Sequence, residues 1–318
     1  DSGAWTVPHG DHFHYYSAEP RIVGTVEGTG AATVATSSTR AAVWFGDSGT
    51  GIVLDSGDLG AGTLTETTRI TTAPHRNGAL VPLGDILLGT VGNGQGDAAG
   101  VRVYDAAGDP VGGGSGSASD GSGDSGGGNA GDVDGASATC EGLSGTITTN
   151  VGVVFGCADC ALLATQGDAA GAGSADGAVT FERIPYPDGT GEELRATAFA
   201  QRPGRPVLAS VAADRGAWLL DTRARTWTLV PTERPLVRAV AASDDAGRLV
   251  ALDVDGRVVV VETETGAVAV SAPLVADPTR ATLDVDASRA YLNDPDGAVV
   301  HEIDYADSAR VARSIETP

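Results

Sequence analysis

Residues 249–270, LVALDVDGRVVVVETETGAVAV, contain three short apolar runs that are rich in valine and separated by two polar turns. The first turn is Asp253-Val-Asp-Gly256, and the second is Glu262-Thr-Glu-Thr265. Short runs of β-branched residues bounded by Asp, Gly and other polar residues are typical of β-strands joined by tight turns. The stretch therefore predicts two successive β-hairpins.

The same unit of strand, Asp-containing turn and strand recurs along the chain. The clearest copies repeat every 41 residues when Asp214, Asp255 and Asp296 are taken as equivalent turn residues. Six copies can be counted, at residues 42–55, 101–111, 153–167, 208–230, 249–270 and 290–315. Helical periodicity is almost absent from the sequence. A repeat of about 40 residues made of short strands is typical of one blade of a β-propeller, in which neighbouring blades bury each other's faces.

The sequence thus predicts an all-β protein, a β-propeller of six to eight four-stranded blades. We expect the propeller over residues 20–318 and a His-rich metal-binding arm over residues 1–19. Residues 112–139, rich in Gly, Ser and Asp, are predicted to form a disordered loop between blades, because they have too little apolar content to offset their ordering entropy. The last apolar run, Arg310 to Glu316, is predicted to complete the first blade and close the ring.

Composition and charge exclude several functions. The 318 residues carry a net charge of −22, and all 20 basic residues are Arg. Such an acidic chain lacks the basic surface that nucleic acids require. Without lysine there is no Schiff-base chemistry, and no nucleophile elbow or dinucleotide-binding glycine motif occurs, so we expect no enzymatic activity.

The location of the protein is predicted from what the sequence lacks and from its cysteines. No apolar run approaches 18 residues, so we expect no transmembrane helix. The chain begins at Asp1 without a signal peptide, which suggests that a leader has been removed, and any lipid anchor is expected outside these residues. Of Cys140, Cys157 and Cys160, two are expected to pair in an oxidising compartment. The residues leave Cys140–Cys157 and Cys157–Cys160 both open.

The segment Pro8-His-Gly-Asp-His-Phe-His-Tyr-Tyr16 carries the strongest chemical pattern in the chain. Imidazole is a preferred zinc ligand, and short His-rich tracts indicate metal binding. On one continuous strand His12 and His14 would share a face and His9 would lie on the other, so the chain must turn near Gly10 for all three to meet one ion. Asp11 could serve as a fourth ligand or orient an imidazole.

Two further histidines lie elsewhere. His75 falls in a predicted turn, Thr72-Ala-Pro-His-Arg-Asn-Gly78, and a loop at the central channel would let it approach the arm. We therefore count His75 as a candidate ligand, the alternative being an ordinary exposed loop histidine. His301 lies inside a predicted strand and is expected to pack there.

The chain resembles the AztD-like zinc metallochaperones, extracytoplasmic β-propellers found beside zinc ABC transporters. The matching segments are HGDHFHYYSAEPRIVGTVEG (residues 9–28), APHRNGALVPLGD (73–85), VFGCADCALLA (154–164) and YLNDPDGAVVHEID (291–304). The first segment is also similar to the H-x-x-H-x-H triads of streptococcal zinc-acquisition proteins. Departures are the single His75 followed by Arg76, where the family often has a richer His cluster, and Ser144, where it can carry a histidine.

The resemblance implies zinc binding through His9, His12, His14 and His75, and a disulfide between Cys140 and Cys157. It implies delivery of Zn²⁺ to the solute-binding protein of a zinc ABC transporter, by a monomer located outside the cytoplasm as a secreted, cell-surface or periplasmic protein. The alternative hypothesis is a cell-surface propeller that binds other proteins, with incidental metal binding. A propeller lactonase or glycosidase using carboxylates in the central channel is a third.

Overall fold

The computed structural model describes residues 24–112, 136–167 and 178–317, together with the strand backbones at 4–9, 12–17 and 133–134. This part of the chain is almost entirely β-structure, as predicted. Its helical segments are one short helix, α1 (Ser56–Ala61), and one 3₁₀ turn, η1 (Glu192–Leu194). No helix in the described ranges is long and apolar enough to cross a membrane.

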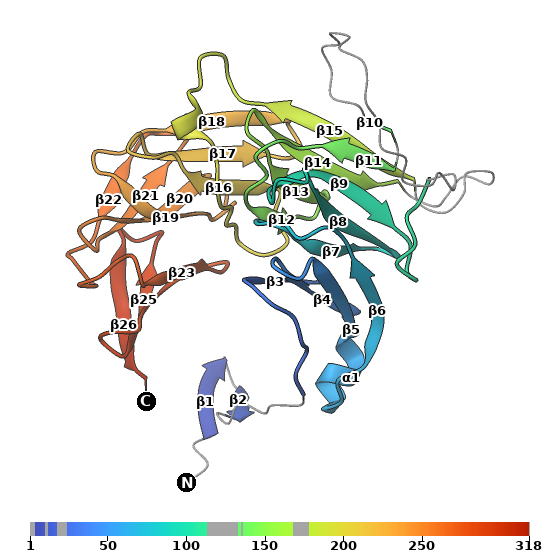
Figure 1. Cartoon of the computed structure of the whole chain (residues 1–318). Coiled ribbons are helices and arrows are strands. Elements are labelled where there is room, and N and C mark those ends of the chain that lie inside the picture. Colours follow the sequence, from blue (N-terminus) through green and yellow to red (C-terminus); the bar gives the residue numbers. More distant parts are fainter. Residues whose placement is uncertain are drawn as a thin grey trace.

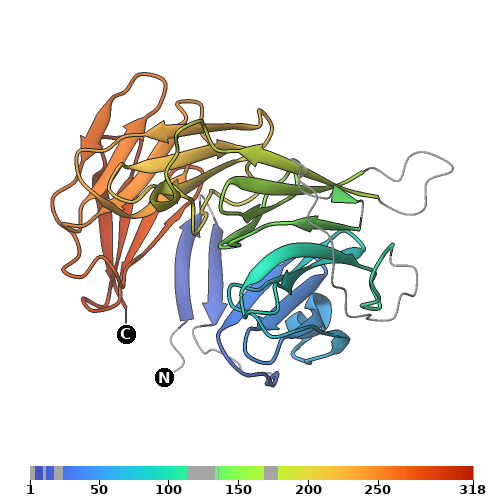
Figure 2. The ribbon, with the colours of Figure 1, turned by 45° about the horizontal axis from the view of Figure 1, so that its top comes forward.

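Six antiparallel sheets follow one another around a central axis (Figures 1 and 2). We number them blades 1 to 6. Blade 1 contains β3 (Ala32–Thr36), β4 (Arg40–Phe45), β5 (Thr50–Asp55) and β6 (Glu66–Thr71). Blade 2 contains β7 (Leu80–Leu83), β8 (Ile86–Gly92), β9 (Ala98–Tyr104), β11 (Ser137–Thr139) and β10 (Val133–Asp134), in that spatial order. Blade 3 contains β12 (Thr146–Thr148), β13 (Val153–Gly156), β14 (Cys160–Gln166) and β15 (Val179–Pro185).

The second half of the chain is more regular. Blade 4 contains β16 (Val207–Val211), β17 (Ala217–Asp221) and β18 (Thr226–Val230). Blade 5 contains β19 (Leu236–Ala241), β20 (Arg248–Asp253), β21 (Val258–Glu262) and β22 (Val268–Val270). Blade 6 contains β23 (Thr282–Val285), β24 (Ala290–Asp294), β25 (Val299–Asp304) and β26 (Arg310–Glu316). The described residues therefore form six blades, the lower end of the predicted range.

The predicted loop over residues 112–139 is shorter at its C-terminal end than expected. Residues 137–139 form β11, which pairs with β9, because Ala138 alternates with polar neighbours and packs its methyl group into the core. Residues 113–132 and 135, the centre of that prediction, lie outside the described residues.

Aspartates at the tight turns explain the repeat. Oδ1 of Asp253, at the end of β20, accepts hydrogen bonds from the backbone N–H groups of Asp255 and Arg257, and Oδ1 of Asp294 closes the β24–β25 turn in the same way. In blade 4 this role belongs to Asp221, whose Oδ1 accepts from two turn amides. The equivalence assumed for Asp214 was wrong, since Asp214 lies one hairpin earlier, between β16 and β17.

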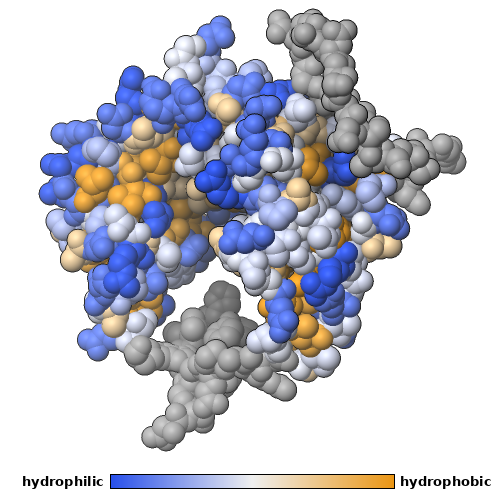
Figure 3. All heavy atoms as spheres, viewed as in Figure 1, coloured by the Kyte–Doolittle hydropathy of each residue, from blue (hydrophilic) through white to orange (hydrophobic). Residues whose placement is uncertain are grey.

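The core lies between blades rather than within any one of them. Each pair of consecutive blades shares a cluster of buried side chains. Each cluster contains residues from both of its blades, for example Trp44 and Leu87, Leu88 and Phe155, Leu163 and Leu220, Leu219 and Leu249, and Leu252 and Leu292. Hydrophilic residues cover much of the rim in Figure 3.

Blades 6 and 1 stand at the two ends of the arc in Figure 1. The strand Arg310–Glu316 was predicted to complete blade 1. This prediction was wrong, because the strand pairs with β25 inside blade 6. The outer face of blade 1 is covered locally: Phe45, Ile52 and Leu54 pack beneath Val26 and the α1 region. Blade 1 already has four strands of its own, β3 to β6, so β26 is not needed to complete it.

Candidate functional site

The histidine motif forms a two-stranded antiparallel ribbon, β1 (Ala4–His9) and β2 (His12–Ser17). His9 is paired directly with His12 in the register, and His14 follows two residues later. Residues that face each other across an antiparallel pair share a face of the ribbon, as do residues two apart on one strand. The chain reversal between His9 and His12 therefore brings all three positions to the same face.

On one continuous strand His9 would lie on the other face from His12 and His14. The hairpin register places all three positions on one face, as a shared ion requires. Asp11, the predicted fourth ligand, lies outside the described residues, as does Gly10. Zinc coordination by this ribbon stays a prediction.

His75 is a buried histidine rather than an exposed one. Only 2% of its surface is accessible, and its ring lies 4.8 Å from that of Trp44. Nδ1 lies 2.7 Å from the carbonyl oxygen of Ala73, so Nδ1 carries the proton in this contact, because a carbonyl can only accept. Nε2 lies 2.8 Å from Oγ1 of Thr90 and accepts its hydroxyl hydrogen in that tautomer.

Burial lowers the pKa of His75, and the hydrogen bond to the Ala73 carbonyl partly opposes this effect. The ring is thus held neutral, which suits a metal ligand, but both nitrogens are engaged within the protein. Binding zinc would require one of these hydrogen bonds to break. The structure places His75 in the interface of blades 1 and 2, so its ligand role stays a prediction that this geometry does not favour.

His301 lies on β25 as predicted, half-buried, with Nδ1 2.9 Å from Oγ of Ser314 on the adjacent strand β26. Among the residues whose side chains are described, no group of three or more His, Cys, Asp or Glu residues could hold a metal ion. The candidate ligands at residues 9–14 are not among those side chains.

The residues alone left two cysteine pairings open, and the structure contains the one that the resemblance implied. Cys140, directly after β11, forms a disulfide with Cys157, directly after β13, and so links blades 2 and 3. Cys160 is a free, buried thiol at the start of β14. Burial raises the pKa of Cys160 to about 12. It is therefore a packed side chain rather than a reactive one.

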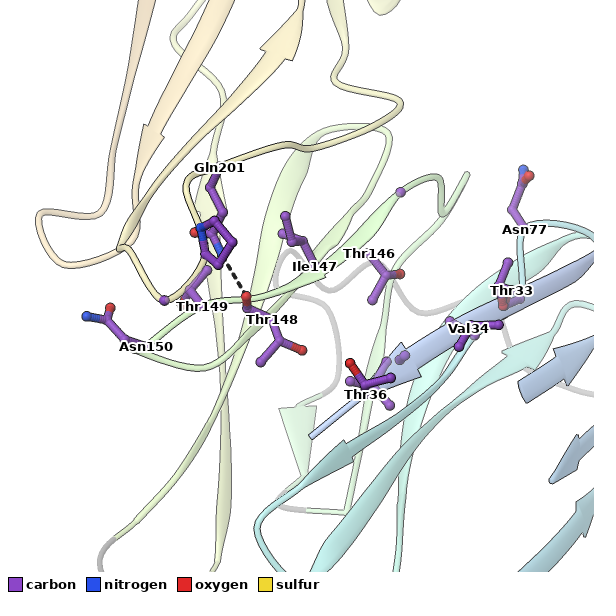
Figure 4. A pocket seen from close by; sticks show the side chains of 17 residues that line it. Thr33, Val34, Thr36, Asn77, Thr146, Ile147, Thr148, Thr149, Asn150 and Gln201 are labelled. Atoms are coloured by element: carbon purple, nitrogen blue, oxygen red, sulfur yellow. Dashed lines mark hydrogen bonds between the residues drawn. The ribbon is translucent and has the colours of Figure 1, made fainter. Parts of the chain in front are cut away.

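A cavity of about 660 Å³ lies against the inner strands of blades 1, 2 and 3 (Figure 4). Its walls come from β3, residues 77–79 and 81, the segment 145–150 around β12, and residues 201, 203 and 204 of the following connection. None of the lining residues is ionisable, although the chain as a whole is 19% charged. Gln201 spans part of the wall and donates from Nε2 to the carbonyl of Thr148 over 2.7 Å.

Gly78 separates this cavity from the buried pair of Trp44 and His75. A Cβ atom at Gly78 would lie 2.1 Å from Nε1 of Trp44 and 2.9 Å from Nε2 of His75. The sequence did not reveal the cavity, because Thr, Asn and Gln contributed by three blades form no linear motif.

No protein-family model matches the chain, and no curated protein matches it significantly. Among solved structures, the chain is similar to a crystal structure of Citrobacter koseri AztD, with a TM-score of 0.71 and 20% identity over 99% of this chain and 79% of that one. It is also similar to the structure of apo AztD from Citrobacter koseri, with a TM-score of 0.69 and 19% identity over 90% of this chain and 72% of that one. At this identity the likeness shows the fold alone: the chain has an AztD-like β-propeller fold.

Proposed function

We propose that the protein is an extracytoplasmic zinc-binding metallochaperone and has no catalytic activity. The observation that carries the proposal is the register of the β1–β2 ribbon, which places His9, His12 and His14 on one face. Three imidazoles with one further ligand make a tetrahedral zinc site, with Zn–N distances of about 2.0–2.1 Å. Asp11 or water supplies the fourth position.

The ribbon suits transfer better than storage. It is a two-stranded sheet, and an isolated hairpin is only marginally stable without further packing. A site on such an element can pass its ion to an acceptor while its histidine ligands detach from the ion one at a time. Three features support the proposal: the sequence resemblance to AztD-like metallochaperones, the AztD-like fold, and the Cys140–Cys157 disulfide, which fits an oxidising compartment. We propose the solute-binding protein of a zinc ABC transporter as the acceptor.

The test is a His9/His12/His14→Ala variant measured for zinc affinity in a chelator-buffered titration. Its matched control is His301→Ala, which removes a half-buried strand histidine that contacts Ser314 instead. We expect the triple variant to lose at least about 100-fold in affinity, since it removes three of the four proposed ligands, and the control to keep the wild-type value. Equal affinity in the triple variant and the wild type would reject the ribbon as the zinc site.

Delivery is tested with the zinc-loaded protein and the purified solute-binding protein. We expect transfer to be faster than zinc release to a chelator of matched affinity, because the acceptor takes over ligands before the ion is free. Transfer no faster than dissociation would reject the chaperone role while leaving the zinc site intact.

A further inference from the structure

The innermost strand of blade 1, β3, has a free edge inside the cavity. Gly46 donates its N–H to the carbonyl of Ala31, and Ser37 donates its N–H to the carbonyl of Arg40. Antiparallel ladders alternate, so every second residue bonds across the pair. In this register residues 31, 33, 35 and 37 bond to β4. The N–H and C=O groups of Ala32, Val34 and Thr36 therefore point away from β4, and no strand in the described chain pairs with them.

The first strands of two other blades have this edge blocked. In β7 one of the two outward-pointing residues is Pro82, which has no N–H to donate. In β16 both outward groups of Ala209 are bonded to the backbone of Ala200. Proline and local covering segments are the devices by which proteins keep a sheet edge from adding a further strand.

Each of the remaining first strands has one outward group bonded or carries a charge. The outward carbonyl of Thr148 in β12 accepts a hydrogen bond from the side chain of Gln201, and the carbonyl of Ala241 in β19 accepts one from the backbone N–H of Arg202. β23 carries the exposed Asp284, a charge of the kind that discourages pairing. β3, with the sequence Ala-Thr-Val-Ala-Thr, has none of these devices among the described residues.

The surroundings of β3 match an uncharged strand. Four of its five residues are exposed, and Val34 keeps 66% of its surface accessible. The cavity beside it is lined by hydroxyl, amide and apolar groups and by no ionisable group, so a charged ligand would find no ionic partner in its walls. Figure 4 shows side chains of β3 and of β12 on facing sides of this space.

We propose that β3 binds an extended, uncharged peptide segment of a partner protein by strand addition within the central cavity. About five residues of the peptide, the length of β3, pair with Ala32, Val34 and Thr36 through main-chain hydrogen bonds. Its alternate side chains, small or β-branched, face the threonines and Val34. This site uses residues other than those of the β1–β2 ribbon and does not depend on the proposed zinc function.

The test starts from a phage-displayed library of random linear peptides selected on the intact protein. Selected peptides, fluorescein-labelled, are titrated by anisotropy against wild type, Val34→Lys and Val268→Lys. Val268 is the matched control, because it is also a valine on an edge strand and is 60% exposed, but it lies on β22 outside the cavity. We expect Val34→Lys to weaken binding by about tenfold or more and Val268→Lys by less than about twofold, since an edge charge blocks strand addition only where it occurs.

A second measurement follows backbone amide exchange in residues 32–36. The amides of Val34 and Thr36 should exchange fast in the free protein and slow down with peptide bound, while those of Thr33 and Ala35 are protected in both states. The proposal is overturned if the library yields no binder, if both lysine variants bind alike, or if these amides do not respond. It is also overturned if β3 instead pairs with a second copy, seen as a dimer that Val34→Lys converts to a monomer.

Discussion

At the scale of single residues, the buried His75 makes the stability of the protein depend on pH. Because burial lowers its pKa in the folded state, the unfolded chain takes up the proton first as the pH falls below about 6.5, the ordinary value for histidine. The unfolded state then binds more protons than the folded state, so the free energy of unfolding decreases as the pH falls.

We therefore expect the melting temperature to drop between pH 7 and pH 5 by more in the wild type than in His75→Gln, which cannot titrate. Thermal melts at several pH values, followed by circular dichroism, measure this difference. Parallel curves for the two proteins would mean that His75 does not titrate differently on folding.

Cys160 should be inert in the folded protein. Its thiol is buried, with 1% of its surface accessible, and burial raises its pKa to about 12, so almost no thiolate exists at neutral pH. We expect no reaction with Ellman's reagent under native conditions and one thiol per chain after unfolding without reductant. Rapid native labelling would contradict this burial, and three thiols after unfolding would contradict the disulfide.

At the scale of elements, the loop before β7 depends on the absence of a side chain at Gly78. A methyl group there would meet Trp44 at 2.1 Å, and the indole is fixed in the core between blades 1 and 2. We expect Gly78→Ala to lower the free energy of unfolding by about 1–3 kcal/mol through overpacking. Gly60→Ala in α1 is the matched control, because a Cβ at Gly60 meets nothing within 4 Å.

Denaturant unfolding at equilibrium measures both variants. Alanine at Gly60 should be neutral or slightly stabilising, since it favours the helix. If Gly78→Ala is as stable as Gly60→Ala, the loop must have room to move away from Trp44.

The sequence predicted these elements well where their turns are regular. The hairpins at Asp253 and Asp294 follow from Asp and Gly at fixed offsets, because the aspartate side chain closes each turn by itself. Asp214 was wrongly matched to Asp255 and Asp296, because an Asp-Arg-Gly between two apolar runs resembles a turn whichever pair of strands it joins. The burial of His75 could not be predicted, because Trp44 and Thr90, which enclose it, come from two different blades.

At the scale of the whole molecule, the repeat was enough to predict a propeller, because each blade needs neighbours to bury its faces. Ring closure was not predictable in the same way. The pattern of Arg310–Glu316 fits any sheet edge, and the choice between blades 1 and 6 was decided by the neighbouring strand β25. The covering of blade 1 by Val26 and α1 likewise depends on contacts that no sequence motif predicts.

The organisation of the molecule separates two tasks. The six blades form a frame whose cavity is lined by residues without ionisable side chains, while His9, His12 and His14 precede the frame on a small ribbon. The net charge of −22 attracts a cation towards the molecule, more strongly at low ionic strength. In the proposed function, zinc capture and the framework therefore belong to different parts of the chain.

The chain has only five histidines, so one experiment can observe all of them. Long-range ¹H–¹⁵N correlation spectra of the imidazole rings, recorded while zinc is added to one equivalent, report directly which nitrogens bind the metal. The account predicts that the resonances of His9, His12 and His14 shift together, while those of His75 and His301 stay in place. Shifts at His75, or no shift at the three ribbon histidines, would contradict it.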